Sequence, residues 1–291
     1  MNKVANGWLS GFLGVLIFSG SLPATKVAVM GFDPVFLTVA RASIAGSLAL
    51  CLLLMFKEKR PTRSDLLPLA IVTLGVVVGF PLLTALALQY VTSAHSIVFI
   101  GLLPMATAIF GVVRGGEQPR PAFWLFSGLG SALVVGFALT QNLTQSLSAS
   151  PVGDALMLAA IIVCGLGYAE GANLSRKLGG WQVISWALVL SLPVMLLLTL
   201  LLLPSSFASV GTSAWVGLAY VSLFSMLIGF IFWYRGLAQG GIAAVSQLQL
   251  LQPFFGLALA AILLHESVTR SMFVVTAAIV LCVASARRFA K

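Results

Sequence analysis

The sequence predicts an all-α integral membrane protein with ten transmembrane helices and both termini in the cytoplasm. Three observations predict it: an apolar composition, ten apolar stretches of helical length, and basic residues gathered in alternate loops. Of the 291 residues, 60% are hydrophobic and only 8% are charged, and the mean hydropathy is +1.09. Because a soluble domain has roughly 25% charged residues, lipid must surround most of this surface.

The apolar stretches have the length of membrane spans. A hydrocarbon core of about 30 Å needs about 20 helical residues. Helices are expected because these stretches lack the alternation of a membrane β-barrel. The first stretch has no clean cleavage site after its apolar core, so it is expected to be a retained helix. The ten predicted spans are 8–29, 34–56, 66–88, 92–113, 121–141, 152–174, 181–203, 213–235, 242–264 and 270–287.

The basic residues predict the orientation of these spans. Of the 16 Lys and Arg residues, 13 fall on one side of the predicted membrane. They are Lys3, Lys57, Lys59, Arg60, Arg63, Arg114, Arg120, Arg176, Lys177, Arg235, Arg287, Arg288 and Lys291. Basic residues accumulate in cytoplasmic loops, so both termini are expected in the cytoplasm.

Several other functions are disfavoured by the sequence. The net charge of +9 does not indicate a nucleic-acid partner, because the basic residues form short clusters between apolar stretches. Cys51, Cys164 and Cys282 lie far apart and show no metal-binding spacing. No GxxxxGK[ST] phosphate loop is present. We therefore expect no metal, no cofactor and no nucleic-acid partner.

Two pairs of matching segments indicate an internal duplication. Residues 102–117 read LLPMATAIFGVVRGGE and residues 251–266 read LQPFFGLALAAILLHE, and in each a proline precedes a glutamate by 13 residues. Ahead of them, GFPLLTALALQ (79–89) matches GFIFWYRGLAQ (229–239). The same order in both halves favours duplication over chance.

The duplication predicts two five-helix repeats, residues 8–141 and 152–288, separated by an uncharged linker. Five spans is an odd number, so the second repeat would enter the membrane from the opposite side. Inverted repeats are the usual architecture of secondary transporters, whose substrate site lies at the repeat interface. Since the partner repeat is already in the chain, a monomer would suffice.

These repeats, each with a proline ahead of a glutamate that closes its fourth span, resemble the EamA-type ten-helix members of the drug/metabolite transporter superfamily. The resemblance covers about residues 8 to 288. Arg41, in VARASIAG, is similar to the arginine common in the second span of this family. The chain is most similar to bacterial aromatic amino acid exporters. The resemblance implies a basket of ten helices around a central cavity, which exports small metabolites by alternating access.

Polar, charged and aromatic residues within the spans are the candidates for substrate binding, because ionisable groups are costly in a membrane and rings stack on aromatic or cationic substrates. Arg41 would bind a substrate carboxylate or anchor its helix to backbone carbonyls. A histidine suits proton coupling, so His95 would couple transport or form an interfacial hydrogen bond. Ser246 and Gln249 would face the cavity or join helices. The predicted cavity residues are Phe18, Ser21, Arg41, Tyr90, His95, Phe99, Tyr168, Trp186, Tyr234, Ser246 and Gln249.

A second set of residues is predicted to act in gating or as hinges. Prolines within spans free backbone carbonyls and permit bending. Glu170 lies near the cytoplasmic interface, where it would pair with Arg176 or Lys177 or gate the cavity. This set comprises Pro23, Pro81, Pro104, Glu170 and Pro253. Glu117 and Glu266, at the ends of their spans, are expected to be structural.

The sequence thus predicts a secondary transporter that exports aromatic and other neutral amino acids or similar amphiphiles. The alternative is a multidrug or quaternary-cation exporter, whose small four-helix relatives rely on a glutamate in the first span; span 1 here has none. An enzyme is not expected, because two distant histidines supply no nucleophile–base pair. A channel is disfavoured to the same degree as an enzyme. The expected partners are a small-molecule substrate and the lipid bilayer.

Overall fold

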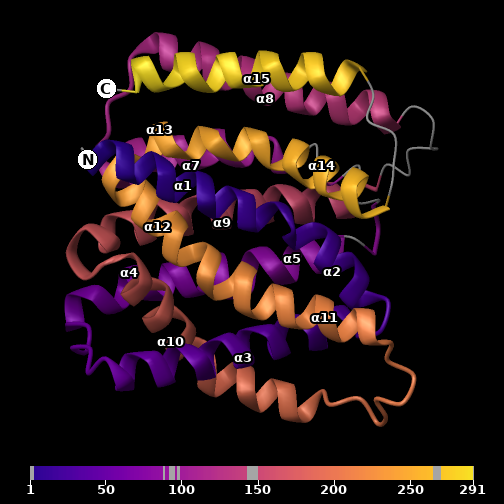
Figure 1. The fold of residues 1–291 in the computed structure, drawn as a ribbon. Coiled ribbons are helices and arrows are strands. Elements are labelled where there is room, and N and C mark those ends of the chain that lie inside the picture. Colours follow the sequence, from indigo (N-terminus) through magenta and orange to yellow (C-terminus); the bar gives the residue numbers. More distant parts are fainter. Residues whose placement is uncertain are drawn as a thin grey trace.

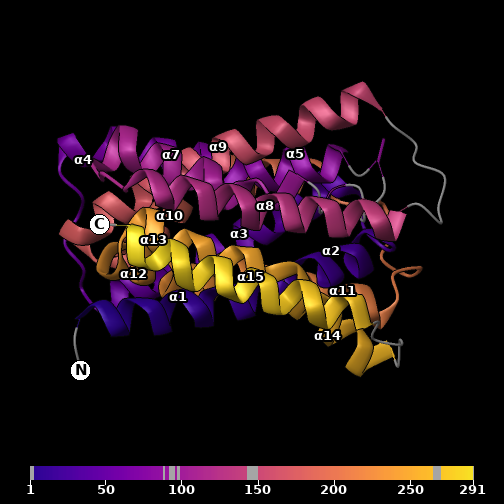
Figure 2. The same cartoon turned by 90° about the horizontal axis from the view of Figure 1, so that it is seen from above.

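The computed structural model describes residues 3–87, 89–91, 96, 99–142, 150–264 and 270–290. Within these ranges every regular element is helical. The helices run roughly alongside one another in an elongated bundle (Figures 1 and 2). Both ends of the chain lie at the same end of this bundle, which we name the terminal end.

The first half of the chain contains α1 (Lys3–Ser19), α2 (Ser21–Val29), α3 (Pro34–Met55), α4 (Arg63–Val72), η1 (Thr73–Gly79), α5 (Phe80–Ala87), α7 (Leu103–Gly115) and α8 (Pro121–Asn142). The second half contains α9 (Pro151–Leu178), α10 (Gly180–Leu201), α11 (Thr212–Tyr220), η2 (Val221–Ile228), α12 (Gly229–Gly240), α13 (Ile242–Ser246), η3 (Gln247–Leu251), α14 (Gln252–Leu264) and α15 (Arg270–Phe289). The segments η1 and η2 are π-helical, and η3 is a 3₁₀-helix.

The helices have the length and surface of membrane spans. In the described part of the chain, six helical stretches are long and apolar enough to cross a membrane: Lys3–Val29, Pro34–Met55, Arg63–Ala87, Pro151–Leu178, Gly180–Leu201 and Thr212–Gly240. Shorter apolar helices cover Leu103–Gly115 and Pro121–Phe137. Large apolar side chains face outward, such as Val113 at 69% and Leu201 at 70% exposure. The predicted all-helical membrane fold is confirmed to this extent, whereas the count of ten spans and the side on which the termini lie stay predictions.

Each of the two matching segments begins with Gly-Phe, and each Gly-Phe pair lies at the end of a π-helical segment. In η1 the N–H of Phe80 bonds to the carbonyl of Gly75, and in η2 the N–H of Gly229 bonds to that of Phe224, so each bond spans five residues. A Cβ on Gly79 would collide with the carbonyl oxygen of Leu74. Glycine therefore permits the π-turn that the repeated sequence forms.

The repeated prolines also occupy equivalent positions. Pro104 is the second residue of α7 and Pro253 the second residue of α14, and both helices have 13 residues. A proline in the first helical turn loses no intrahelical hydrogen bond. This applies to Pro104, whereas Pro253 lies within one continuous helical stretch, Ile242–Leu264, at the point where it changes from 3₁₀ to α. Glu266, which completes the second motif, lies outside the described residues.

Glycines bring α1 and α12 into backbone contact at the terminal end. A Cβ on Gly236 would lie 2.6 Å from the amide nitrogen of Gly11, and one on Gly7 would lie 2.5 Å from that of Gly240. Helices in membranes associate through such small residues because lipid offers no hydrophobic gain from burial.

Glu117 joins three segments at the terminal end. Its two carboxylate oxygens accept hydrogen bonds from the backbone N–H groups of Ile242 and Ala243, each at 2.7 Å, at the start of α13. The guanidinium of Arg176, at the end of α9, lies 3.1 Å from the same carboxylate. Glu117 thus has the structural role expected from the sequence, as the acceptor for a helix start.

Two further ion pairs lie in the same region. Glu170 of α9 is buried and pairs with Arg114 of α7 rather than with its neighbours Arg176 or Lys177. Lys177 instead pairs with Asp65 of α4 at 2.6 Å. Together with Glu117, these pairs connect α4, α7, α9 and α13.

The contact between α1 and α12 predicts the effect of adding one methyl group. Gly236→Ala should destabilise the protein, because backbone atoms of α1 occupy the space that the Cβ needs. Gly128→Ala in α8 is the matched control: no atom lies within 4 Å of its Cβ, and alanine favours a helix by about 1 kcal/mol over glycine. Thermal unfolding in detergent should show a lower midpoint for Gly236→Ala alone. Equal midpoints would contradict the packing described.

The role of Glu117 predicts a second stability effect. Glu117→Ala should lower the free energy of unfolding by about 2 kcal/mol, because two amide groups lose a charged acceptor. Glu58→Ala is the matched control, since Glu58 accepts one long side-chain hydrogen bond, at 3.3 Å from Gln182. Denaturant unfolding in micelles measures both, and a Glu117 variant no weaker than the Glu58 variant would refute the assignment.

Candidate functional site

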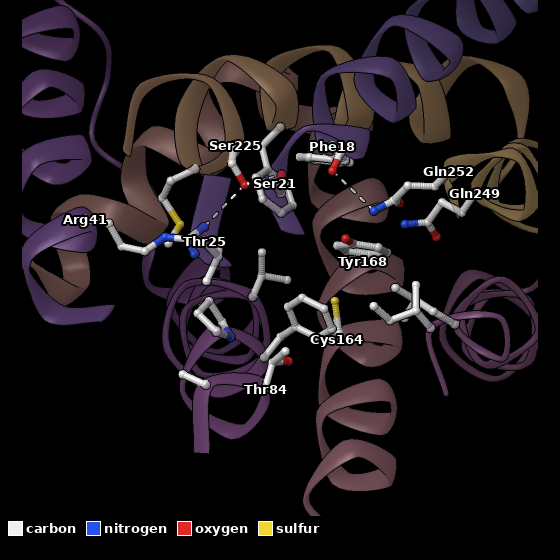
Figure 3. A pocket seen from close by; sticks show the side chains of 18 residues that line it. Phe18, Ser21, Thr25, Arg41, Thr84, Cys164, Tyr168, Ser225, Gln249 and Gln252 are labelled. Atoms are coloured by element: carbon white, nitrogen blue, oxygen red, sulfur yellow. Dashed lines mark hydrogen bonds between the residues drawn. The ribbon is translucent and has the colours of Figure 1, made fainter. Parts of the chain in front are cut away.

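A cavity in the interior of the bundle is lined from both halves of the chain (Figure 3). The centres of water molecules can occupy a volume of about 80 Å³ inside it. Its polar lining consists of Ser21, Thr25, Arg41, Thr84, Cys164, Tyr168, Ser225, Gln249 and Gln252. Its apolar lining consists of Phe18, Val76, Phe80, Pro81, Ala85, Ile100, Leu103, Met226 and Phe230.

A break in the first span contributes to one wall of the cavity. The helix is interrupted at Gly20, where a Cβ would collide with the hydroxyl of Tyr220. The carbonyl of Ile17 accepts both the N–H of Gly20 at 3.3 Å and the Tyr220 hydroxyl at 2.7 Å, and that of Phe18 accepts Gln252 Nε2 at 3.4 Å. Side chains of other helices thus donate hydrogen bonds to carbonyls beside the break.

The two π-helical segments also contribute to the walls of the cavity. Val76 of η1 lines the cavity, as do Ser225 and Met226 of η2. The phenylalanines that follow the two segments, Phe80 and Phe230, line it as well. π-Bulges occur frequently at functional sites because they turn side chains out of the regular helical register.

Arg41 brings a positive charge to this cavity. Its side chain is 9% exposed, and its guanidinium donates to Ser225 Oγ at 3.3 Å. Ser225 Oγ also accepts a hydrogen bond from Ser21 at 2.8 Å. None of the ion pairs within the described ranges includes Arg41. The observed partner is a hydroxyl, which is neither the substrate carboxylate nor the backbone carbonyl expected from the sequence. No carboxylate among the described residues neutralises the charge.

Three buried polar atoms of the lining have no hydrogen-bond partner within the described protein: Arg41 Nε, Thr84 Oγ1 and Gln249 Oε1. Buried polar groups almost always have a partner, so water, a ligand or a residue outside the described ranges is expected to satisfy these atoms. The set combines a cationic donor, a hydroxyl and an amide oxygen that can accept.

The polar groups are distributed unevenly around the cavity. Figure 3 shows Arg41 near Ser225 and Ser21 on one side, and Gln249 and Gln252 beside Tyr168 on the other. The rings of Phe18 and Phe230 pack together with centroids 4.9 Å apart. The cavity therefore combines a cationic side, an amide side and an aromatic wall.

Five of the predicted cavity residues line this cavity: Phe18, Ser21, Arg41, Tyr168 and Gln249. Of the predicted hinge residues, Pro81 also lines it. Pro23 is exposed in the first turn of α2, after the break at Gly20. Glu170 lies in the ion pair with Arg114 instead.

The other predicted residues lie elsewhere. Tyr90 is 49% exposed, and Phe99 and Trp186 pack against the hydrophobic core. Tyr234 is fully buried and donates to the carbonyl of Gly167 at 3.2 Å. Ser246 bonds to the carbonyls of Ala243 and Pro104 at 2.9 and 3.3 Å. Ser246 thus joins helices, the other role expected for it. His95 lies outside the described residues.

The prediction omitted five polar lining residues: Thr25, Thr84, Cys164, Ser225 and Gln252. Helical spacing could have found three of them. Thr25 is four residues after Ser21, Cys164 four before Tyr168, and Gln252 three after Gln249, so each shares a helix face with a predicted residue. Ser225 lies in the π-turn of η2, where regular spacing does not apply. Thr84 is three residues after Pro81, which was predicted as a hinge and not as a cavity residue, so extension from the predicted cavity residues would have missed it.

Comparisons with known proteins agree with this architecture. The sequence model described as "EamA-like transporter family" matches residues 5–139 and 151–286. "Uncharacterized transporter YdeK" of Bacillus subtilis (strain 168) is 68% identical over 291 residues, which is all of both chains. An "Uncharacterized transporter" of Archaeoglobus fulgidus is 23% identical over 252 residues, or 84% of each chain.

The fold also has a solved counterpart. A structure titled "Crystal structure of protein" superposes with a TM-score of 0.79 and covers 96% of this chain and 97% of its own, at 19% sequence identity. This likeness concerns the fold alone. The family match over nearly the whole chain, together with the identity to a full-length relative, shows that this chain belongs to the EamA-like transporter family of the drug/metabolite transporter superfamily and is a multi-pass membrane transporter.

Proposed function

We propose that this transporter exports small amphiphilic metabolites that carry a carboxylate, above all aromatic and other neutral amino acids, across the bacterial inner (plasma) membrane by alternating access. The observation that carries the proposal is Arg41, a buried guanidinium on the cavity wall with no carboxylate partner in the described protein. An unpaired charge in a membrane interior is costly and marks a functional site. A substrate carboxylate would neutralise it.

The remaining lining suits the rest of such a substrate. The wall formed by Phe18, Phe230 and Tyr168 offers ring faces and edges to an apolar or aromatic side chain. Gln249 Oε1, which has no partner in the described protein, could accept a hydrogen bond from an ammonium, indole or hydroxyl group of the substrate.

The architecture we propose is ten spans in two inverted repeats, residues 8–141 and 152–288. The recurrence of the π-helical segments η1 and η2, and of a proline at the second position of α7 and α14, supports duplication. Both termini lie at the same end of the bundle, which is consistent with an even number of spans. The positions of the basic residues favour the cytoplasm as the side on which this end lies. The cavity, lined from both halves, lies where such repeats bind substrate.

The same cavity disfavours the alternative, export of quaternary cations or cationic drugs. Such a substrate requires an acidic group to offset its charge. The described residues of the lining include no Asp or Glu, and Arg41 would repel a cation. Glu170, which was expected from the sequence to gate the cavity or to pair with a neighbouring basic residue, forms an ion pair with Arg114 outside the lining.

The proposal predicts uptake of radiolabelled phenylalanine into liposomes that contain the purified protein, with competition by tryptophan. Arg41→Gln should raise the KM for phenylalanine about 10- to 100-fold, because a hydrogen bond to a charged group contributes about 1.5–3 kcal/mol. Initial rates over a concentration series measure the change.

Arg120→Gln is the matched control, since Arg120 is exposed in the loop before α8 and its loss removes the same charge. It should leave the KM unchanged. An Arg41→Gln protein that keeps the KM of the unaltered protein would refute the role of Arg41. Uptake of tetraphenylphosphonium but not of phenylalanine would favour the cation exporter.

A further inference from the structure

A second hollow opens on the outside of the bundle, between α1, η3 and α15, and is separate in lining from the central cavity. Its floor is formed by Trp8, Leu248, Leu251, Val280 and Val283. It offers about 500 Å³ to the centres of water molecules, against about 80 Å³ in the central cavity. A space of this size is larger than side-chain mismatches leave between packed helices.

The floor follows one face of α15. Val283 and Ala284 lie three and four residues after Val280, and Arg287 lies four and three residues after them, so these residues share a side of the helix. From Val280 to Arg287 the helix rises about 10 Å, at 1.5 Å per residue. One leaflet of a hydrocarbon core is about 15 Å deep. The groove therefore covers most of the depth of one leaflet with apolar side chains.

The groove ends in two arginines at the terminal end. Arg287 and Arg288 are both exposed, and neither enters an ion pair among the described residues. The Arg287 guanidinium lies 4.6 Å from the ring centroid of Trp8, which holds it above the mouth of the groove. Tryptophan and arginine near a helix end mark the level of the lipid headgroups.

We propose that this groove binds one anionic phospholipid. An acyl chain would lie over Leu248, Leu251, Val280 and Val283, and its phosphate would lie at Arg287 and Arg288. A zwitterionic headgroup would bring its cation to the same arginines and gain less from them. A soluble phosphate would leave the apolar floor uncovered. Basic pockets between transmembrane helices on the cytoplasmic side suit acidic headgroups in charge and depth.

The lipid would have a structural consequence for α15. This helix packs mainly along α8, and the pair lies at one edge of the bundle in Figure 1. A bound acyl chain would fill the seam between α15 and α1.

Quenching of Trp8 by brominated lipids tests the proposal, because bromine quenches indole fluorescence only at close range. The difference between the unaltered protein and Trp8→Phe isolates the signal of Trp8. Phosphatidylglycerol with brominated chains, titrated into protein in mild detergent, should quench Trp8 at lower concentration than brominated phosphatidylcholine. The double variant Arg287→Gln/Arg288→Gln should weaken phosphatidylglycerol binding about 25-fold, or about fivefold per arginine, and leave phosphatidylcholine binding unchanged.

The control is Lys59→Gln/Arg60→Gln, which removes two exposed charges from the same predicted side and should keep the affinity. Should the double variant be poorly folded, Arg288→Gln alone, with an expected fivefold loss, replaces it. Equal quenching by the two lipids would overturn the proposal, as would arginine variants that bind like the unaltered protein. Displacement of the lipid by glycerol phosphate alone would also overturn it, because the site would then hold a free anion.

Discussion

The charge of Arg41 in the middle of an apolar bundle is the constraint on which the rest of this structure depends. A guanidinium cannot release its proton at ordinary pH, so the protein must surround it with polar groups or leave it for a ligand. Ser225 and Ser21 provide one chain of hydroxyls, and Arg41 Nε has no hydrogen-bond partner in the part of the chain that the structure describes. The fold accepts this cost, as expected of a binding site.

Irregular helical segments position these hydroxyls beside Arg41. Ser225 lies in the π-turn of η2, and Ser21 begins α2 directly after the break at Gly20. Regular α-helices in lipid satisfy their own backbone, so each irregularity must be compensated. Here Gln252 donates to the carbonyl of Phe18, and Tyr220 adds a second donor to the carbonyl of Ile17, which also accepts the N–H of Gly20. The residues that compensate the break thus also position the cavity.

Much of the fold could be predicted from the sequence because lipid imposes simple rules of length and polarity. The apolar stretches, the matching GF segments and the repeated prolines all correspond to features of the described structure. The wide turns of η1 and η2 could not be predicted, because glycine followed by phenylalanine permits a π-turn without requiring it. The repeat could be recognised from these residues, although their structural role could not be deduced from the sequence.

The candidate site was predicted less completely, for a physical reason. Residue type identifies costly groups such as Arg41, but the direction of a ring depends on the packing of its helix. Tyr168 faces the cavity, whereas Tyr234, equally aromatic, is buried against Gly167. Extension of each predicted cavity residue along its helix face would have found Thr25, Cys164 and Gln252. Tertiary contacts alone distinguish the remaining residues.

The most direct test of the account is whether a substrate needs its carboxylate. Uptake of labelled phenylalanine by the unaltered protein in liposomes would be measured against increasing phenylalaninamide, which keeps the ring and the amino group and lacks the negative charge. If Arg41 pairs with the carboxylate, phenylalaninamide should compete about 10- to 100-fold more weakly than unlabelled phenylalanine. Equal competition by the two compounds would contradict the account.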